Sequence, residues 1–112
     1  MKPKGRPQKT RLIRELPKIA QFSPRGKPGR PEEVELTIDQ FEALKLADHQ
    51  GLDQYKGAQA MGISRPSFGR ILRVARKKLA DAMVNGKIIR ILGGNVSLAR
   101  SKDKENQPKS LA

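Results

Sequence analysis

The clearest periodic pattern of apolar side chains lies between residues 65 and 84. Apolar residues recur there three and four positions apart, which is the spacing of one face of an α-helix. The set is Phe68, Ile71, Leu72, Ala75, Leu79 and Ala82. On a helical wheel these residues fall within an arc of roughly 100°, and basic residues occupy another side. The pattern predicts a long amphipathic helix over about residues 65–84.

Shorter patterns predict two helices before the long one. Thr37 and Gln40 have the spacing of a capping box, which begins a first helix over about residues 38–49. A second, short helix follows over about residues 54–61. Its interior glycine, Gly57, lowers its intrinsic stability, so we expect this helix to depend on packing against the rest of the domain.

The junction of the second and third helices predicts a helix-turn-helix. Ala58 is small where two helices cross closely, and Gly62 supplies the positive φ that a sharp turn requires. Ser64 is a preferred N-cap residue for the long helix. Two helices joined by a three- to four-residue turn containing glycine form the motif that places its second helix in the DNA major groove. A helical hairpin within an ordinary core is the alternative.

The remaining segments predict little regular structure. Residues 1–31 contain six of the eight prolines and are expected to form an extended basic arm. We expect a short strand at residues 87–92 and a flexible, disordered tail over residues 96–112. The predicted fold is therefore a small all-α domain of three helices over residues 32–95, with the arm before it and the tail after it.

Charge is distributed unevenly along the chain, whose formal net charge is +13. Residues 1–31 hold ten Lys or Arg against one acidic residue, and residues 65–95 hold eight against one. Residues 32–64 hold seven acidic residues against two basic ones. The basic charge is thus concentrated in the arm and in the long helix, which indicates a nucleic-acid partner.

The basic residues of the long helix form a stripe beside the apolar one. Its five members are Arg65, Arg70, Arg73, Arg76 and Lys77. Four of them are arginines, whose planar fork suits phosphate and guanine. The residues that we expect to contact DNA here are Ser64, Arg65, Ser67, Arg70, Arg73 and Lys77. The alternative is a solvated basic face without a DNA partner.

This part of the chain resembles known DNA-binding proteins. The run GISRPSFGRILRVARKKL at residues 62–79 looks like the promoter-reading region 4 of sigma-70 factors. Over about residues 11–95 the chain also resembles domain-of-unknown-function family 134, a prokaryotic family of uncharacterised, predicted DNA-binding proteins. The matching pieces include LPK (16–18), LTIDQFEALKLAD (36–48), ADAMVNGK (80–87) and GGN (93–95).

The resemblance implies a sigma-like helix-turn-helix and a role in transcriptional regulation, with RNA polymerase as an expected partner. Gly57 departs from the pattern, because a larger apolar residue is usual there. The absence of cysteines near the N-terminus is a second departure.

A narrower resemblance lies in the arm. Gly5-Arg6-Pro7 and Gly29-Arg30-Pro31 are similar to the Gly-Arg-Pro arms that enter the minor groove in AT-hooks and in serine-recombinase DNA-binding domains. Glycine permits close approach, proline stiffens the arm, and arginine is attracted to a narrow, negative minor groove. We therefore add Arg6 and Arg30 to the expected DNA contacts. A basic linker is the alternative.

The residue types offer little for catalysis or metal binding. The chain has no cysteine and His49 is its only histidine, so a Cys/His metal site cannot form. No base is expected beside Ser64 or Ser67, so neither is a candidate nucleophile. We predict a non-enzyme without a metal or cofactor.

No apolar run approaches the roughly 18 residues of a membrane span, so we expect a cytoplasmic, nucleoid-associated protein.

These observations together predict a sequence-specific double-stranded DNA-binding protein that regulates transcription, with a homodimer as one expected assembly. The first alternative is a basic RNA-binding or ribosome-associated protein, although base stacking in such proteins favours exposed aromatics and this chain has four aromatic residues. The second alternative is the DNA-binding component of a recombinase or transposase.

Overall fold

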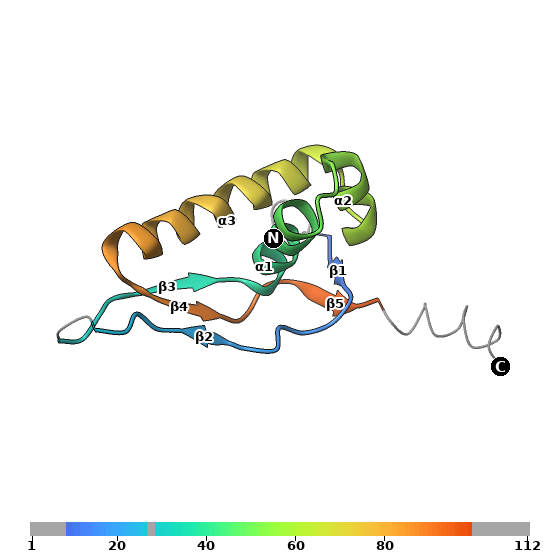
Figure 1. The fold of residues 1–112 in the computed structure, drawn as a ribbon. Helices are drawn as coiled ribbons and strands as arrows, with labels where there is room; N and C mark the ends of the chain where they lie inside the picture. The colour runs from blue at the N-terminus through green and yellow to red at the C-terminus, as the bar shows by residue number, and fades with distance from the viewer. Residues whose placement is uncertain (1–8, 27–28, 100–112) are drawn as a thin grey trace, which may run out of the picture.

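The computed structural model describes residues 9–26 and 29–99, in which three helices and a π-helical turn lie on two small sheets (Figure 1). In chain order the elements are β1 (Arg11–Ile13), β2 (Gln21–Phe22), β3 (Glu33–Leu36), α1 (Ile38–Leu44), the π-helical turn η1 (Lys45–His49), α2 (Gln54–Met61), α3 (Arg65–Asn85), β4 (Ile88–Ile91) and β5 (Val96–Leu98). The prediction of an all-α fold is therefore wrong, because the chain forms a small α/β domain.

The larger sheet has the strand order β2-β4-β3, with β4 in the middle. β4 pairs antiparallel with β2 and parallel with β3, so that Val34 lies opposite Ile89 and Leu36 opposite Ile91. Parallel neighbours require a long crossover connection. Here the connection from β3 to β4 contains all the helices of the described chain, and Figure 1 shows α3 lying along β3 and β4.

β1 and β5 form a separate parallel pair, in which Arg11 lies opposite Val96 and Ile13 opposite Leu98. Both strands lie in segments that we expected to be an extended arm and a disordered tail. Each strand has three residues and a partner far away in the sequence, so neither shows the local alternation that predicts a strand. Ile13 is nevertheless buried, with 2% of its surface exposed. The two segments thus contribute to the fold.

The predicted helices lie close to their expected bounds. α2 has the predicted range, and α3 ends one residue later than predicted. The first helix reaches His49 as predicted, but its last five residues are wound as the π-helical turn η1. The side-chain oxygen of Gln40 accepts a hydrogen bond from the Thr37 amide at 3.0 Å, as expected for a capping box. β4 confirms the strand predicted at residues 87–92.

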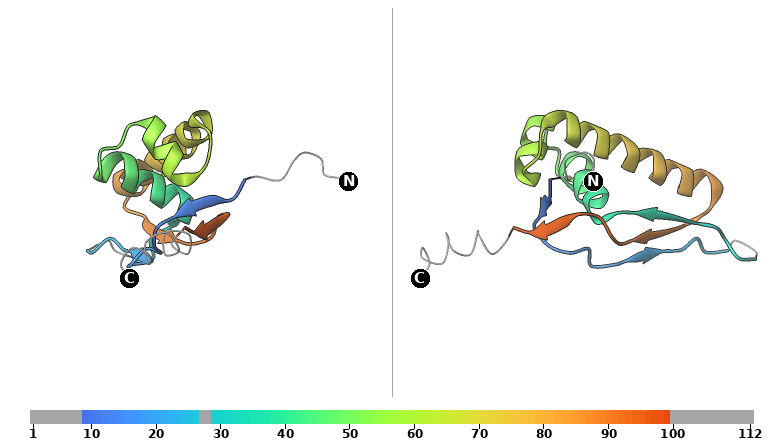
Figure 2. Two further views of the ribbon diagram at one scale, coloured as in Figure 1. Left: turned by 90° about the vertical axis from the view of Figure 1, so that its right-hand side faces the viewer. Right: turned by 180° about the vertical axis from the view of Figure 1, so that it is seen from behind.

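Two clusters of buried side chains form the core. The first lies among the helices and consists of Ala43, Leu46, Ala58, Met61, Phe68, Ile71 and Leu72. The second lies between α3 and the larger sheet and consists of Leu36, Ala75 and Ile91. The apolar stripe of α3 therefore packs on the other helices near its N-terminus and on the sheet farther along. Figures 1 and 2 show α2 beside the N-terminal end of α3, beyond the three-stranded sheet.

Candidate nucleic-acid interface

A short turn joins α2 to α3 and fixes where α3 begins. Gly62 has a φ of 67°, in the left-handed region, which confirms the prediction for this position. The amide of Ile63 then donates to the carbonyl of Ala58 at 3.0 Å, as in a Schellman motif. Ser64 caps α3, because its hydroxyl oxygen accepts a hydrogen bond from the amide of Ser67 at 3.2 Å.

The two helices of this motif cross where Gly57 faces Phe68. The side chain of Phe68 is fully buried, and a Cβ atom added at Gly57 would lie 2.8 Å from its Cε1 and 2.9 Å from its Cε2. Real Cβ atoms do not approach a ring so closely, since the van der Waals separation of carbon atoms is about 3.5–4.0 Å. A glycine at position 57 is therefore required by the position of the Phe68 ring.

The first turns of α3 carry three exposed arginines, Arg65, Arg70 and Arg73, which we call the α3 basic cluster. Together with Gln54 at the start of α2, these side chains line a hollow between the two helices. Gly69 lies on the same side of α3 and faces Gln54 without a side chain of its own. The structure thus brings the three arginines onto one open surface. Gln54 is a member of this surface that the sequence pattern did not identify.

A chain of hydrogen bonds links this cluster to the helix cap. The hydroxyl of Ser64 donates to the Ser67 hydroxyl oxygen at 3.0 Å, and the Arg70 Nη2 donates to the same oxygen at 3.3 Å. A serine oxygen accepts at most two hydrogen bonds and carries one proton of its own. Ser67 is therefore left with its hydroxyl proton to donate. A phosphate or base acceptor at this surface would satisfy it.

The basic stripe that we predicted along α3 is divided. Arg76 makes two hydrogen bonds to the Asp48 carboxylate of η1, at 2.7 and 3.0 Å. This hydrogen bonding lowers the pKa of Asp48 and raises the pKa of Arg76. Lys78 Nζ donates to the carbonyl of Glu35 at 2.7 Å, so this lysine is turned toward β3. Lys77 is exposed but lies farther along the helix than the α3 basic cluster.

Basic side chains at the other end of α3 are matched by carboxylates. Lys87 Nζ lies 2.9 Å from an Asp81 oxygen and 3.5 Å from a Glu32 oxygen, while Arg90 lies 3.6 Å from Glu33. Hydrogen bonding between Lys87 and Asp81 raises the pKa of the lysine and lowers that of the aspartate. Within the described part of the chain, by contrast, the α3 basic cluster forms no ion pair.

Of the arginines in the two Gly-Arg-Pro sequences, the structure describes only Arg30, and it does not bring Arg30 to the α3 basic cluster. Arg6 lies outside the described residues. Arg30 is exposed just before β3, where the Glu32 carbonyl accepts a hydrogen bond from the amide of Ile88, beyond the end of α3. A helix of 21 residues is about 31 Å long. Arg30, just before β3, and Arg65, at the start of α3, therefore lie toward opposite ends of that helix. Figure 1 shows the start of β3 below the C-terminal end of α3.

β1 lies beside the exposed side of α3. Arg11 of β1 and Arg70 of α3 line the same hollow, together with Val74 and Asn95. Arg11 Nη1 is 3.5 Å from Asp39 Oδ2, and this largely buried contact ties β1 to the start of α1. The chain therefore enters the domain beside the N-terminal half of α3. β1 has only three residues, and a pattern that short does not predict the position of β1 beside α3.

The described residues contain no helix that is long and apolar enough to span a membrane. In the same part of the chain, no group of three His, Asp or Glu side chains is arranged to hold a metal ion. His49 is exposed on η1.

Residues 1–99 match the family described as "Protein of unknown function DUF134". The chain belongs to this family. The UPF0251 protein of Desulfosudis oleivorans is 54% identical over 91 residues, which are 80% of this chain and 66% of that protein. The UPF0251 protein of Chlorobium chlorochromatii is 50% identical over 93 residues, which are 82% of this chain and 52% of that protein.

A UPF0251 protein of Methanococcus vannielii is 45% identical over 105 residues, which are 93% of this chain and 81% of that protein. The matched part of the chain spans between half and two thirds of the length of the relatives from D. oleivorans and C. chlorochromatii. No solved structure matches the chain significantly. The resemblance to the DUF134 family is confirmed, and the names of these relatives state no activity.

Proposed function

We propose that this protein binds double-stranded DNA sequence-specifically, with α3 in the major groove, and that it regulates transcription. The observation that carries the proposal is the position of the α3 basic cluster on the first turns of the second helix of a helix-turn-helix. In DNA-binding motifs of this kind, the N-terminal residues of the second helix contact base edges. Arginine offers two parallel donors to O6 and N7 of guanine.

The pattern of ion pairs supports this orientation on DNA. Arg76, Lys87 and Arg90 are matched by carboxylates, whereas no carboxylate of the described chain pairs with the α3 basic cluster. Within the described chain, three positive charges without a carboxylate partner therefore gather where α2 meets α3. DNA approaching the protein would be steered to that surface.

Within this proposal, Arg65 and Arg70 contact bases, while Arg73 and Lys77 contact phosphates. Ser67 donates its hydroxyl proton to an acceptor on the DNA. Phosphate contacts fix the register of the helix in the groove, and base contacts supply the specificity.

We assign the minor-groove contact to the segment before β1, which contains Arg6, because β1 lies beside α3. Arg30 precedes β3, near the far end of α3, and is left out of the assignment. We also propose that the protein acts in the cytoplasm at the nucleoid. Its proposed partners are RNA polymerase and a second copy of this chain.

RNA binding has less support from the described surface. Proteins that read single-stranded RNA stack bases on exposed aromatic side chains. Phe68 is fully buried, and the exposed aromatics Tyr55 and Phe22 lie on different elements, α2 and β2. They do not form a stacking surface together with the α3 basic cluster.

Selection of bound duplexes from a random DNA pool tests the proposal. We expect the full chain to enrich one sequence motif, and a palindromic motif would indicate a dimer. Recovery of duplexes with no common sequence would contradict sequence-specific binding. Tighter binding to a matched RNA pool would favour the RNA-binding alternative. A selected motif that occurs in genomic DNA only at transposon ends would favour the recombinase alternative.

A further inference from the structure

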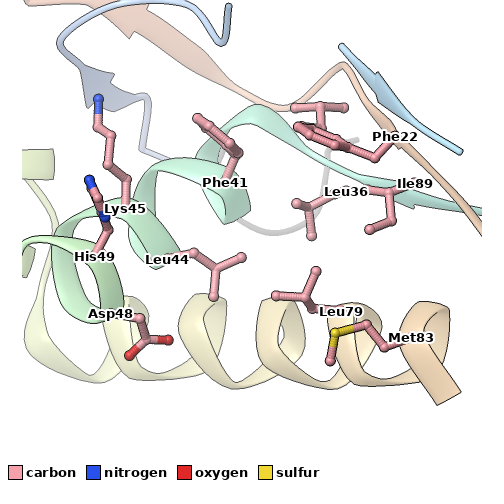
Figure 3. A pocket seen from close by; sticks show the side chains of 11 residues that line it. Phe22, Leu36, Phe41, Leu44, Lys45, Asp48, His49, Leu79, Met83 and Ile89 are labelled. Atoms are coloured by element: carbon pink, nitrogen blue, oxygen red, sulfur yellow. The ribbon is translucent and has the colours of Figure 1, made fainter. Parts of the chain in front are cut away.

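An apolar cleft lies between α3 and the larger sheet (Figure 3). Its volume is about 600 Å³, within the range of about 300–1,000 Å³ that is typical of small-molecule sites. The apolar side chains that line it are Phe22, Leu36, Phe41, Leu44, Leu79, Met83, Ile89 and Ile91. They come from α1, α3 and all three strands of the larger sheet. The cleft is thus built where the two layers of the fold meet.

The polar side chains that line the cleft, Lys45, Asp48 and His49, all come from the π-helical turn η1. Figure 3 shows them at one end of the cleft, with Met83 toward the other end. π-Helical turns are rare and are frequently found at functional sites. A few polar groups at one end of an apolar cavity are also the usual composition of a ligand site, where they orient the ligand.

Both charges at this end already have partners. Lys45 Nζ lies 3.2 Å from an oxygen of Glu42, whose side chain is almost fully buried, and Asp48 is bound by Arg76. A charged ligand would therefore find no unpaired opposite charge in the cleft, and its desolvation would not be offset. The imidazole of His49 can still donate or accept a hydrogen bond. The balance of charge favours an uncharged ligand.

We propose that the cleft binds a small, uncharged, mainly apolar molecule that carries one hydrogen-bonding group, such as a long-chain or aromatic alcohol. The apolar body lies between Leu79 and the sheet, and the polar group lies at η1. This site is separate from the α3 basic cluster, and the inference does not depend on DNA binding.

The shape of the cleft argues against a second copy of the chain as its occupant. A two-fold contact brings the same surface patch of each copy together. Two copies of a concave cleft would face each other and leave its floor empty. A small ligand, in contrast, would cover the rim residues Phe22 and Met83, which are 50% and 73% exposed.

Titration of the full chain with the uncharged fluorescent probe N-phenyl-1-naphthylamine tests the site. We expect saturable binding of one probe per chain, and displacement by 1-decanol at a concentration at least about tenfold lower than by decanoate or decylamine. Absence of saturable binding would overturn the proposal. Equal displacement by the alcohol and the two ions would also overturn it, since the charge argument would then fail.

A pair of neighbouring variants locates the bound probe. Met83→Glu places a charge at the cleft, whereas Val84→Glu places the same charge on the next residue, which is 80% exposed and does not line the cleft. Both positions are exposed near the end of α3, so both variants should fold. We expect Met83→Glu to weaken probe binding at least about tenfold and Val84→Glu less than about twofold.

Equal effects of the two variants would place the probe elsewhere and overturn the assignment. The parent chain and both variants should also have the same oligomeric state in solution. A parent dimer that Met83→Glu alone dissociates, without saturable probe binding, would show that a second copy covers the cleft and would contradict the proposal.

Discussion

Gly57 and Phe68 share one space between α2 and α3. The ring of Phe68 occupies the volume that any side chain at position 57 would require, and the ring itself is fully buried. A glycine that looks unfavourable from helix propensity alone is therefore favourable for the crossing of the two motif helices. The crossing in turn sets how the α3 basic cluster is presented beside α2.

Two glycine-to-alanine variants should change stability in opposite directions. Gly57→Ala gains about 1 kcal/mol of helix propensity, but overpacking against Phe68 costs typically about 1–3 kcal/mol. We expect a net loss of stability. Gly69→Ala meets the flexible side chain of Gln54 at an ordinary 3.5 Å, so we expect it to be stabilising. Urea unfolding followed by circular dichroism measures both. Stabilisation by Gly57→Ala would contradict the described crossing.

Truncation of the Phe68 ring should be among the most destabilising single changes. Phe68→Ala removes a fully buried side chain, which costs about 3–5 kcal/mol of unfolding free energy. This is a large fraction of the roughly 5–15 kcal/mol that stabilises a typical domain. Phe22→Ala is the control, because Phe22 is half exposed and should cost much less. Similar thermal melting of the two variants would contradict the full burial of Phe68 between α2 and α3.

Removal of the Asp48 carboxylate should strengthen DNA binding, because it releases Arg76 on the side of α3 that carries Arg65. The pair is well exposed, with 55% and 45% of the two side chains accessible, so its loss should cost only about 0–1 kcal/mol of stability. Asp81→Ala is the control, since it changes net charge equally but removes its carboxylate from beside Lys87, at the far end of α3. We expect Asp48→Ala to raise affinity more than Asp81→Ala. Equal gains in a binding titration would indicate a general charge effect.

The two Gly-Arg-Pro sequences should behave differently. Deletion of residues 1–8 removes Arg6 together with two lysines from the segment that leads into β1. We expect this deletion to lower affinity and to weaken the preference for A·T pairs flanking the major-groove site. Arg30→Lys should leave that preference unchanged, because Arg30 lies at the far end of α3. Binding to duplexes with A·T or G·C flanks tests this. Loss of the preference only in Arg30→Lys would contradict the arrangement of β1 beside α3.

Local signals predicted the helices well. Ser64 as a cap and Gly62 as a left-handed residue each depend on neighbours within three or four positions, so the sequence pattern contains the necessary information. The strands β1 and β5 could not be predicted in this way. Their stability comes from a partner far along the chain and from the burial of Ile13.

The residues of the candidate interface that depend on local helical spacing were predicted, and those that depend on long-range packing were not. Arg65, Arg70 and Arg73 follow from helical spacing alone, and the structure places them together. The partner of Arg76 could not be predicted, because Asp48 reaches it only through the packing of η1 on α3. The position of Arg30 depends on where β3 pairs with β4, which no local pattern specifies.

A comparison of Arg70→Ala with Arg90→Ala tests whether the N-terminal turns of α3 read DNA sequence. Both variants remove one exposed arginine, but Arg90 lies on β4 and is paired with Glu33. Affinities for a selected duplex and for a random duplex are measured at one salt concentration. We predict that Arg70→Ala loses about 5- to 150-fold on the selected duplex, the equivalent of about 1–3 kcal/mol, and much less on the random one. Arg90→Ala should change both affinities little. The same loss for both variants, or for both duplexes with Arg70→Ala, would contradict sequence reading by α3.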